Sequence, residues 1–461
     1  MPATIWAWIA GITLSLAVAV CVLCELQSRC GKKSGRPPPS SCYCLASAPL
    51  TPGRWRTSVP IFVVGCIFLY IQSNTGEAAV MTAYLTSPEF RDVEMYRLTS
   101  FGVVKSIFDL WNAEMKELAV LLFSFSVVFP YLKLTLCLTT WFVPLPPYLR
   151  GKVLHVLNAM GKWSLLDAYV LMTLMGLGSL DTHMKGKIGL SVFIDPRPAF
   201  VSFLVATIIS LVLGEVILGC HETNLEQPAP ANRSGSAPNL IVHLLIFALV
   251  LLAVASCLDV CTFEVQGIVG WFLNYLHGDS GGNQFKFSLL SLGVKLSNVT
   301  SDAHQMVAFF MQVIYFMSTL VMNIAFILAA IVFAKVPLRR GAAEWAQMLL
   351  PVIFLWGAAD VYAIGTILTI IETRHGSFVP TPGWLREEIQ QTIRPRIMMP
   401  GASNEIIQII PRVEVGAWFI FIGALIYGLA GCHLLRHIEG GEDEGGDKLT
   451  DDGGTSASES E

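Results

Sequence analysis

Long apolar stretches recur along the chain, and their length sets the first prediction. A bilayer core about 30 Å thick is crossed by roughly 20 mostly apolar residues of helix. The windows that meet this requirement are 4–24, 59–79, 117–142, 163–182, 199–220, 240–261, 305–334, 348–371 and 415–435. The pattern therefore predicts an all-α membrane protein that crosses the bilayer several times, with small outer segments that have room for β structure.

Composition supports a membrane protein and excludes two other classes. Only 14% of the 461 residues are charged, against about 25% in a soluble domain, and 54% are hydrophobic. The net charge of −4 is too small to favour a nucleic-acid partner. The 11 cysteines are scattered, several of them inside apolar runs, so they do not resemble the framework of a small secreted disulfide protein.

The first window is either a signal peptide or a signal anchor. No basic residue precedes it, and Arg29, Lys32, Lys33 and Arg36 follow it. Positive charge marks the cytosolic side of a membrane helix, so we expect an anchor whose C-terminal end lies in the cytosol.

The loops after that helix follow the same rule. The short segments 143–162 and 335–347 are basic and fall on the cytosolic side, whereas the longer segments 80–116 and 262–304 fall on the outer side. Asn298 begins an outer Asn-Val-Thr sequon and is the glycosylation candidate. The membrane itself, plasma membrane or endomembrane, is left open.

A self-comparison of the sequence predicts a duplication. Residues 163–169, Trp-Ser-Leu-Leu-Asp-Ala-Tyr, recur as residues 356–362, Trp-Gly-Ala-Ala-Asp-Val-Tyr, at an offset of 193 (356 − 163). Residues 98–103 and 289–294 match at an offset of 191 (289 − 98). The second to fifth helices therefore correspond to the sixth to ninth, which predicts two tetraspan-like four-helix modules with the same orientation in the membrane.

This duplication sets the predicted domain boundaries. They are a signal anchor or signal peptide helix over 1–30, a cytosolic Pro/Ser/Arg-rich linker over 31–58, module one over 59–220, a linker over 221–239, module two over 240–435 and an acidic tail over 436–461. The residues of the first linker and of the tail cannot bury a core, so we predict that both are disordered.

Ionisable residues inside the predicted helices are the candidates for function, because each costs free energy in a bilayer. Module one carries Lys133, Asp167 and Glu215, at depths of roughly 13, 6 and 8 Å from the cytosolic helix ends at 1.5 Å per residue. All three are predicted to meet in the cytosolic half of the bundle. A lysine among carboxylates and hydroxyls can move a proton, although such a group can also serve only to fix helix packing.

Polar neighbours extend this network. Ser126 shares a helix face with Lys133, and Pro130 between them is expected to kink the helix and free a carbonyl. Ser164 shares a face with Asp167. Module two keeps the counterpart Asp360 without an obvious cation partner, so we expect that carboxyl to be protonated or to reach a loop arginine.

The aromatic residues of the repeated motif have a separate expected role. Trp163, Tyr169, Trp356 and Tyr362 lie near predicted helix ends. Aromatic side chains are enriched at the membrane–water interface, so we expect these four to be interface anchors.

The pattern Ser126-x3-Pro130-x2-Lys133, a basic loop and Trp163-Ser164-x2-Asp167-x-Tyr169 resembles the paraquat-inducible protein A (PqiA) family, over roughly 59–435. The resemblance implies two four-helix modules and a role in lipid traffic between membranes, beside a partner of the MCE type on the periplasmic or lumenal side. It also implies a lipid-accessible cavity and a proton-coupling network at Ser126, Lys133, Ser164 and Asp167.

The chain departs from that family at its ends. Bacterial members begin with zinc ribbons built from paired C-x2-C motifs, whereas here the C-x2-C of Cys21 and Cys24 lies at the end of an apolar helix, and Cys30, Cys42 and Cys44 lack ribbon spacing. Palmitoylation explains these cysteines as well as zinc does, so we predict no metal and no cofactor. The extra first helix and the acidic tail leave open whether an MCE-type partner exists.

The leading function is lipid transport between membranes, and the alternative is a non-catalytic tetraspan-like scaffold. An intramembrane aspartyl protease would need Asp167 and Asp360 to meet, and neither lies in the motif context of such proteases. No glycine-rich nucleotide loop is present, so an ATP-driven pump is disfavoured. We expect the protein not to be an enzyme.

Overall fold

The computed structural model describes residues 43–86, 93–112, 114–178, 180–182, 189–225, 239–267, 270, 283–297, 305–335, 349–375 and 408–439. The predicted first helix, the glycosylation candidate Asn298 and the acidic tail from residue 440 lie outside this set.

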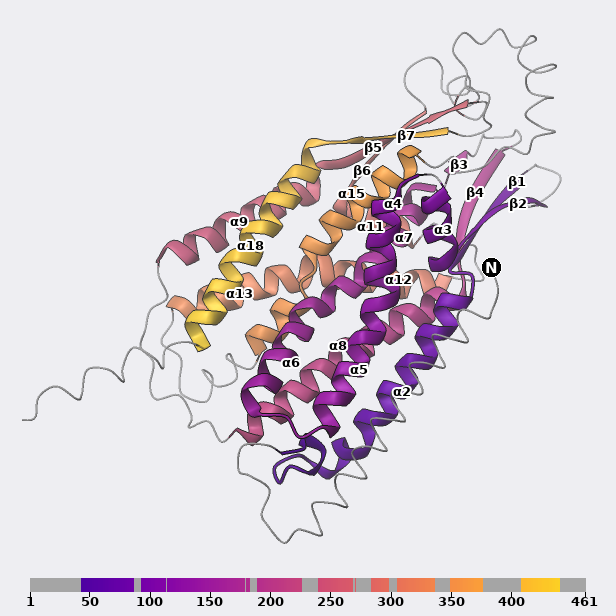
Figure 1. The fold of residues 1–461 in the computed structure, drawn as a ribbon. Coiled ribbons are helices and arrows are strands. Elements are labelled where there is room, and N and C mark those ends of the chain that lie inside the picture. Colours follow the sequence, from indigo (N-terminus) through magenta and orange to yellow (C-terminus); the bar gives the residue numbers. More distant parts are fainter. Residues whose placement is uncertain are drawn as a thin grey trace, which may run out of the picture.

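Seven helices in the described part of the chain are long and apolar enough to cross a membrane. They are α2 (Gly53–Thr75), Lys116–Phe142, α8 (Pro198–Asn224), α9 (Asn239–Cys257), Gln305–Lys335, Leu349–Ile371 and Val415–Leu435, the last within α18 (Val415–Glu439). They lie side by side in one elongated bundle (Figure 1). The predicted all-α membrane fold is confirmed.

Two predicted segments differ from the structure in the first half of the chain. The window 163–182 contains a 3-10 turn, η3 (Lys162–Leu165), and the short helix α7 (Leu166–Gly178), and strand β3 (Leu180–Thr182) follows. The predicted basic loop 143–162 consists mostly of helix α6 (Pro147–Gly161). A proline at the first position favours the start of α6, and buried residues at 150, 154, 157, 158 and 161 form one stripe along it.

Two of the spanning helices contain a π-helical segment. In the first, η2 (Phe123–Val128) joins α4 (Lys116–Leu122) to α5 (Phe129–Phe142). In the second, η5 (Met317–Val321) joins α12 (Gln305–Phe316) to α13 (Met322–Lys335). Pro130 lies in the first turn of α5, directly after η2, where the irregular backbone accommodates its missing donor.

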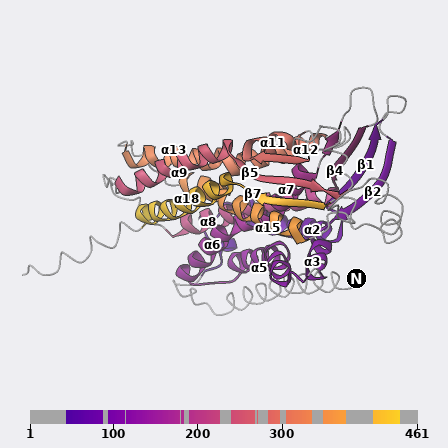
Figure 2. The same cartoon turned by 90° about the horizontal axis from the view of Figure 1, so that it is seen from above.

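Two small antiparallel sheets lie at the same end of the bundle (Figures 1 and 2). The first has the order β2-β1-β4-β3, with β1 Ala79–Thr86, β2 Val93–Phe101 and β4 Gly189–Pro196. The second has the order β6-β5-β7, with β5 Asp259–Gln266, β6 Gln284–Ser288 and β7 Gln408–Val413. The apolar windows 59–79 and 240–261 therefore each end in the first residues of a strand.

The order of elements around each sheet is the same. A spanning helix (α2 or α9) leads into a hairpin, a short helix follows, either α3 (Val103–Asn112) or α11 (Leu289–Leu296), and then the span with the π-helical segment. The last strand, β4 or β7, leads directly into the last helix, α8 or α18. Within each half the first and last helices pack together, α2 on α8 and α9 on α18.

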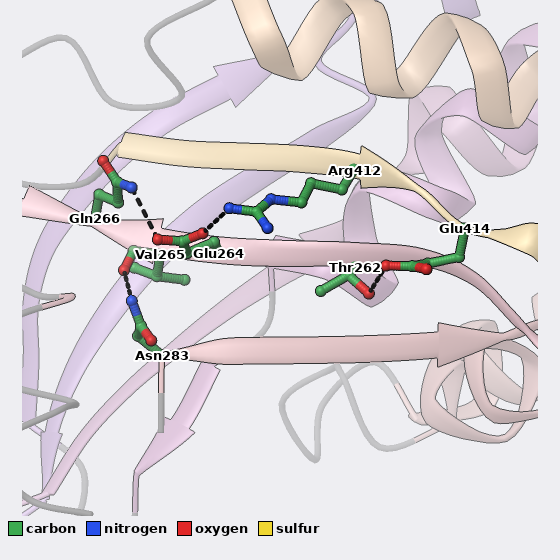
Figure 3. Close-up of polar contacts among 7 residues, drawn as sticks. All are labelled: Thr262, Glu264, Val265, Gln266, Asn283, Arg412 and Glu414. Carbon is green, nitrogen blue, oxygen red and sulfur yellow. Dashed lines mark hydrogen bonds and ion pairs between the residues drawn. The ribbon is translucent and has the colours of Figure 1, made fainter. Parts of the chain in front are cut away.

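Polar side chains tie the second sheet together (Figure 3). Arg412 on β7 donates to Glu264 on β5 at 2.8 Å, and Thr262 donates to Glu414 at 2.8 Å. Asn283 donates to the Val265 carbonyl at 3.1 Å. The contacts of Arg412 and Glu414 connect β5 to a segment far away in the sequence, and that of Asn283 supports the β5–β6 hairpin.

One hydrophobic core runs through both halves of the molecule, because α7 packs on α15 (Ala359–His375). The rings of Tyr169 and Tyr362 meet edge to face at 5.8 Å, and those of Tyr315 and Tyr362 at 5.5 Å. Tyr169 and Tyr362 are each 1% exposed. The expectation that these two tyrosines anchor the membrane interface is therefore wrong: they lie in the buried contact between α7 and α15.

The predicted disordered linker 31–58 is ordered in its described part. Tyr43 forms a β-bridge with Leu145, a 3-10 turn (η1, Leu45–Ser47) follows, and α2 already begins at Gly53. Leu45 is fully buried. The Thr51 hydroxyl oxygen accepts a hydrogen bond from Asn224 at the end of α8. Composition suggested disorder, but packing against the ends of the helices orders this segment.

Candidate functional site

Lys133 lies on α5 inside the bundle and is 1% exposed. Within the described chain it forms no ion pair and no hydrogen bond, although Glu215, Cys66 and Cys137 are close enough to act on its charge. Its Nζ lies against the backbone of Gly161, where an added Cβ would be 2.8 Å from that nitrogen. A cation buried in this way is costly, so its retention calls for a purpose.

The carboxylate that acts electrostatically on Lys133 is Glu215 on α8. Each of these two groups acts electrostatically on the other, and Asn158 on α6 donates to Glu215 Oε1 at 3.3 Å. Asn158 packs directly on Gly214, so a side chain at 214 would displace it. Helices α5, α6 and α8 therefore bring Lys133, Asn158 and Glu215 together, and we call these three residues the lysine cluster.

Asp167 is half-buried in the first turn of α7. No hydrogen bond or ion pair joins it to another described residue, and it is not among the groups that act on Lys133. The structure thus brings together two of the three predicted charges, Lys133 and Glu215, and no described contact adds Asp167 to them.

Two buried hydroxyls lie on elements that pack around the lysine cluster. Ser126 on η2 is 1% exposed and Ser164 on η3 is 2% exposed, and neither hydroxyl has a hydrogen-bond partner in the described structure. Hydroxyls elsewhere in the bundle donate to a backbone carbonyl one turn earlier in their own helix, as that of Thr207 on α8 does. The segments η2 and η3 are held together by Phe125 and Trp163, whose rings stack at 5.6 Å.

A second polar cluster lies where the two halves meet. Lys162 Nζ on η3 is 2.7 Å from Asp360 Oδ2 on α15, and it also lies 5.3 Å from the Phe354 ring. Asp360 was expected to be protonated or to reach a loop arginine, and the structure corrects this: its cation is Lys162 from the other half. In the sequence Lys162 is one of the residues that make the segment 143–162 basic, and the unmatched charge of Asp360 was the one available signal of this pair.

Hydrogen bonds join the π-helical segment η5 to α7, to α13 and to Ala358, two residues before Asp360. The Tyr169 hydroxyl lies 2.5 Å from the Ser318 hydroxyl. The Ser318 carbonyl accepts from the Ala358 amide at 2.9 Å and from Asn323 Nδ2 at 3.0 Å. A π-helical turn leaves such carbonyls without their usual intrahelical donor, so they become available to neighbours. Sequence reasoning missed Ser318 and Asn323 because uncharged residues carry no signal of this kind.

An apolar crevice lies between helices of both halves. It is lined by side chains of α3, α4, α7 and α15, namely Leu110, Leu118, Leu121, Leu122, Val170 and Leu368. All six are aliphatic, so the crevice is apolar and offers no polar partner, and it is narrow.

The described residues contain no group of three or more histidine, cysteine or acidic side chains placed to hold a metal ion. Cys44 donates to the Trp141 carbonyl at 3.3 Å. Cys21, Cys24, Cys30 and Cys42 lie outside the described residues, so the predicted absence of zinc stays a prediction.

Comparisons with known proteins give one match. The family model described as paraquat-inducible protein A matches residues 95–217, which include η2, α5, α6, η3, α7 and most of α8. No curated protein and no solved structure matches the chain. The matched range contains Lys133, Glu215, Asn158 and the two buried serines.

Proposed function

Residues 95–217 belong to the paraquat-inducible protein A family, and from this premise we propose that the protein transports lipid between membranes and couples transport to proton movement. The observation that carries the proposal is Lys133, a cation that is 1% exposed, without an ion pair in the described structure, and beside Glu215. The lipid and the direction of transport are not specified by these contacts.

The proton-coupling part rests on the chemistry of the lysine cluster. An ammonium group and a carboxylate that share a low-dielectric site can exchange one proton, because neutral and charged pairs then differ little in free energy. Asn158 keeps Glu215 oriented, and the unpartnered Ser126 and Ser164 hydroxyls are available to a water or to a lipid phosphate. Loss or gain of the Lys133 charge would change how strongly this region holds an anionic headgroup.

The lipid part rests on the apolar surfaces. The crevice between α3, α4, α7 and α15 offers only aliphatic contacts, the kind that an acyl chain makes, and would have to widen to admit one. Leu110 of α3 is one of its walls, and α3 exposes Phe108 and Trp111. Large exposed aromatic residues on a short amphipathic helix favour a position at the membrane surface, where lipid enters or leaves.

We also infer an internal duplication from three correspondences between the halves: the π-helical segments, the strand orders β2-β1-β4 and β6-β5-β7, and the paired motifs that contain Tyr169 and Tyr362. On this interpretation module one, which has the buried lysine, is the active copy, and module two supports it. A lumenal or periplasmic partner would then meet the end of the bundle that carries the two sheets.

The alternative is a scaffold in which the same residues only fix packing. The test is transfer of a fluorescent phospholipid between two vesicle populations, one of which contains the purified protein, with Lys133→Met against wild type. A transporter loses transfer while Lys133→Met still purifies as a folded protein, whereas a scaffold shows no protein-dependent transfer in either form. The matched control is Lys152→Met, because Lys152 is exposed on α6, one helix away.

A further inference from the structure

The short helices α3 and α11 hold corresponding places in the two halves, and α11 is fixed along its whole length. Three of its leucines, including its first and its last residue, belong to the main hydrophobic core. Leu292 fits against Gly176 of α7, where an added Cβ would be 2.3 Å from its Cδ1. The Tyr315 hydroxyl of the following span donates to the Leu289 carbonyl at 3.1 Å.

Helix α3 is fixed to the main core at its start and packs differently at its end. Val103, its first residue, belongs to the main core, whereas Leu110 belongs to a separate small cluster with Ala119 and Leu122 of α4. Leu110 is also one wall of the apolar crevice between α3, α4, α7 and α15. The end of α3 is therefore attached chiefly to α4, and it covers the crevice.

The turn that joins α3 to α4 is strained. The Met115 amide donates to the Leu110 carbonyl at 3.0 Å and the Glu114 amide to the Trp111 carbonyl at 3.2 Å, which is the pattern of a Schellman motif. Glu114 has a φ of 62°, in the left-handed position that such a motif usually gives to glycine. Among the described residues it is the one non-glycine residue with a positive φ. The turn thus stores strain at the end of α3 that covers the crevice.

The crevice is continuous with the apolar surface of the spanning helices. Its walls Leu121 on α4 and Leu368 on α15 are only partly buried, so the crevice is open on one side. Phe108 and Trp111 of α3 are exposed next to it, and so is Val120 of α4. Exposed aromatic side chains just before a spanning helix are typical of the membrane surface. The neighbour of the crevice is therefore bilayer lipid.

We propose that α3 is a lid over an acyl-chain site: the turn at Glu114 opens, Leu110 leaves the crevice, and one acyl chain of a lipid in the adjacent leaflet enters between α4, α7 and α15. Release of the strain at Glu114 offsets part of the cost of opening, and the entering chain replaces the aliphatic contacts that Leu110 gives up. A polar ligand fits less well, because all the lining side chains are aliphatic. This inference rests on the proposed function for the lipid substrate and adds where the chain enters.

The test is photolabelling of the full-length protein in phosphatidylcholine nanodiscs, with a phospholipid that carries a diazirine in one acyl chain. Mass spectrometry measures the labelling of Val170, a buried wall on α7, relative to that of Val120, which is 53% exposed and contacts lipid whether the lid is open or closed. We expect labelling of Val170 in the wild type and about three-fold less in Glu114→Gly. Glycine adopts the left-handed conformation without strain and so holds the lid closed, although its greater freedom in the open turn offsets part of this gain. No labelling of Val170 in the wild type overturns the site, and equal labelling in the two proteins overturns the lid.

The matched control is Glu114→Gln. It removes the exposed ion pair with Lys116, which measures 2.9 Å, and keeps a side chain in the left-handed position, so labelling of Val170 should stay at the wild-type level. A loss as large as that in Glu114→Gly would assign the effect to charge and overturn the strained lid. Labelling takes place within one membrane, so it can succeed when transfer between vesicles fails. Lys133→Met leaves α3 unchanged and should keep the labelling of Val170, so failure of the lid and failure of the proposed function are distinguishable.

Discussion

Lys162 Nζ lies 2.7 Å from Asp360 Oδ2, so the residue just before the motif of residues 163–169 neutralises the acid inside the motif of residues 356–362. The same two motifs touch through Tyr169 and Tyr362, whose rings meet at 5.8 Å. Charge and aromatic packing therefore join the two halves at one place. Any motion of one half against the other must rearrange this contact.

Loss of one member of this pair is expected to destabilise the protein. Lys162→Gln leaves the Asp360 carboxylate in the interior without a cation. Removal of one partner of a buried ion pair lowers the free energy of unfolding by about 3–5 kcal/mol. The Asp360 side chain is 26% exposed, so we expect a smaller loss, about 2 kcal/mol. The measurement is thermal unfolding in nanodiscs, with the double variant Lys162→Gln/Asp360→Asn as the control. The double variant should recover part of the loss, and equal loss in single and double variants would contradict a paired role.

The hydrogen bond between Tyr169 and Ser318 predicts a coupled pair of variants. Ser318→Ala leaves the buried Tyr169 hydroxyl unpartnered and is expected to cost about 1–3 kcal/mol. Tyr169→Phe added to Ser318→Ala removes the orphaned hydroxyl as well, so the double variant should be no less stable than Ser318→Ala alone. A double-mutant cycle on unfolding in nanodiscs measures this coupling, and strict additivity would show that the contact contributes nothing.

Much of the fold could be predicted from the pattern of apolar windows. Each window from 59 onward contains a helix, because about 20 apolar residues have few alternatives in a bilayer. The exact ends could not be predicted, since the windows 59–79 and 240–261 run on through apolar residues that begin the strands β1 and β5, such as Ala79 and Val260. The helix α6 was missed because its basic residues matched a cytosolic loop.

The candidate site could be predicted only in part. Lys133 and Glu215 were found because buried charge is rare in membrane helices, and the structure brings them together. The partner of Asp360 was missed because pairing across the two halves depends on the packing of α7 on α15, which no sequence offset reveals. Asn323 was missed because its contacts with η5 appear only once neighbouring side chains are placed.

Thiol labelling can test the boundary between α9 and β5. Burial raises the pKa of Cys261 on β5 from 9.0 to about 12, whereas Cys257 at the end of α9 is exposed. We expect Cys257 to react with a soluble maleimide at pH 8 and Cys261 to stay unmodified until the protein unfolds.

The same thiol predicts a pH dependence of stability. Because the pKa of Cys261 is higher in the folded than in the unfolded protein, the folded state binds more protons between pH 9 and 12, so stability falls as pH rises through this window. The variant Cys261→Ser should lose that alkaline dependence, and rapid labelling of Cys261 in the folded protein would contradict its buried position.

Two glycine variants can separate the position of Lys133 from general helix stability. At Gly161 an added Cβ would be 2.8 Å from Lys133 Nζ and 2.9 Å from Leu211 Cδ2, both of them ends of flexible side chains. Gly161→Ala should therefore move the ammonium group away from its site at little cost in stability, and lipid transfer should fall several-fold.

The control is Gly219 on α8, where nothing lies within 4 Å of an added Cβ. Gly219→Ala should stabilise the helix by about 0.5–1 kcal/mol and leave transfer unchanged. Transfer and unfolding are measured on the same preparations. If both variants transfer lipid at the wild-type rate, the exact position of Lys133 does not matter for transport, and the lysine cluster is only a packing feature.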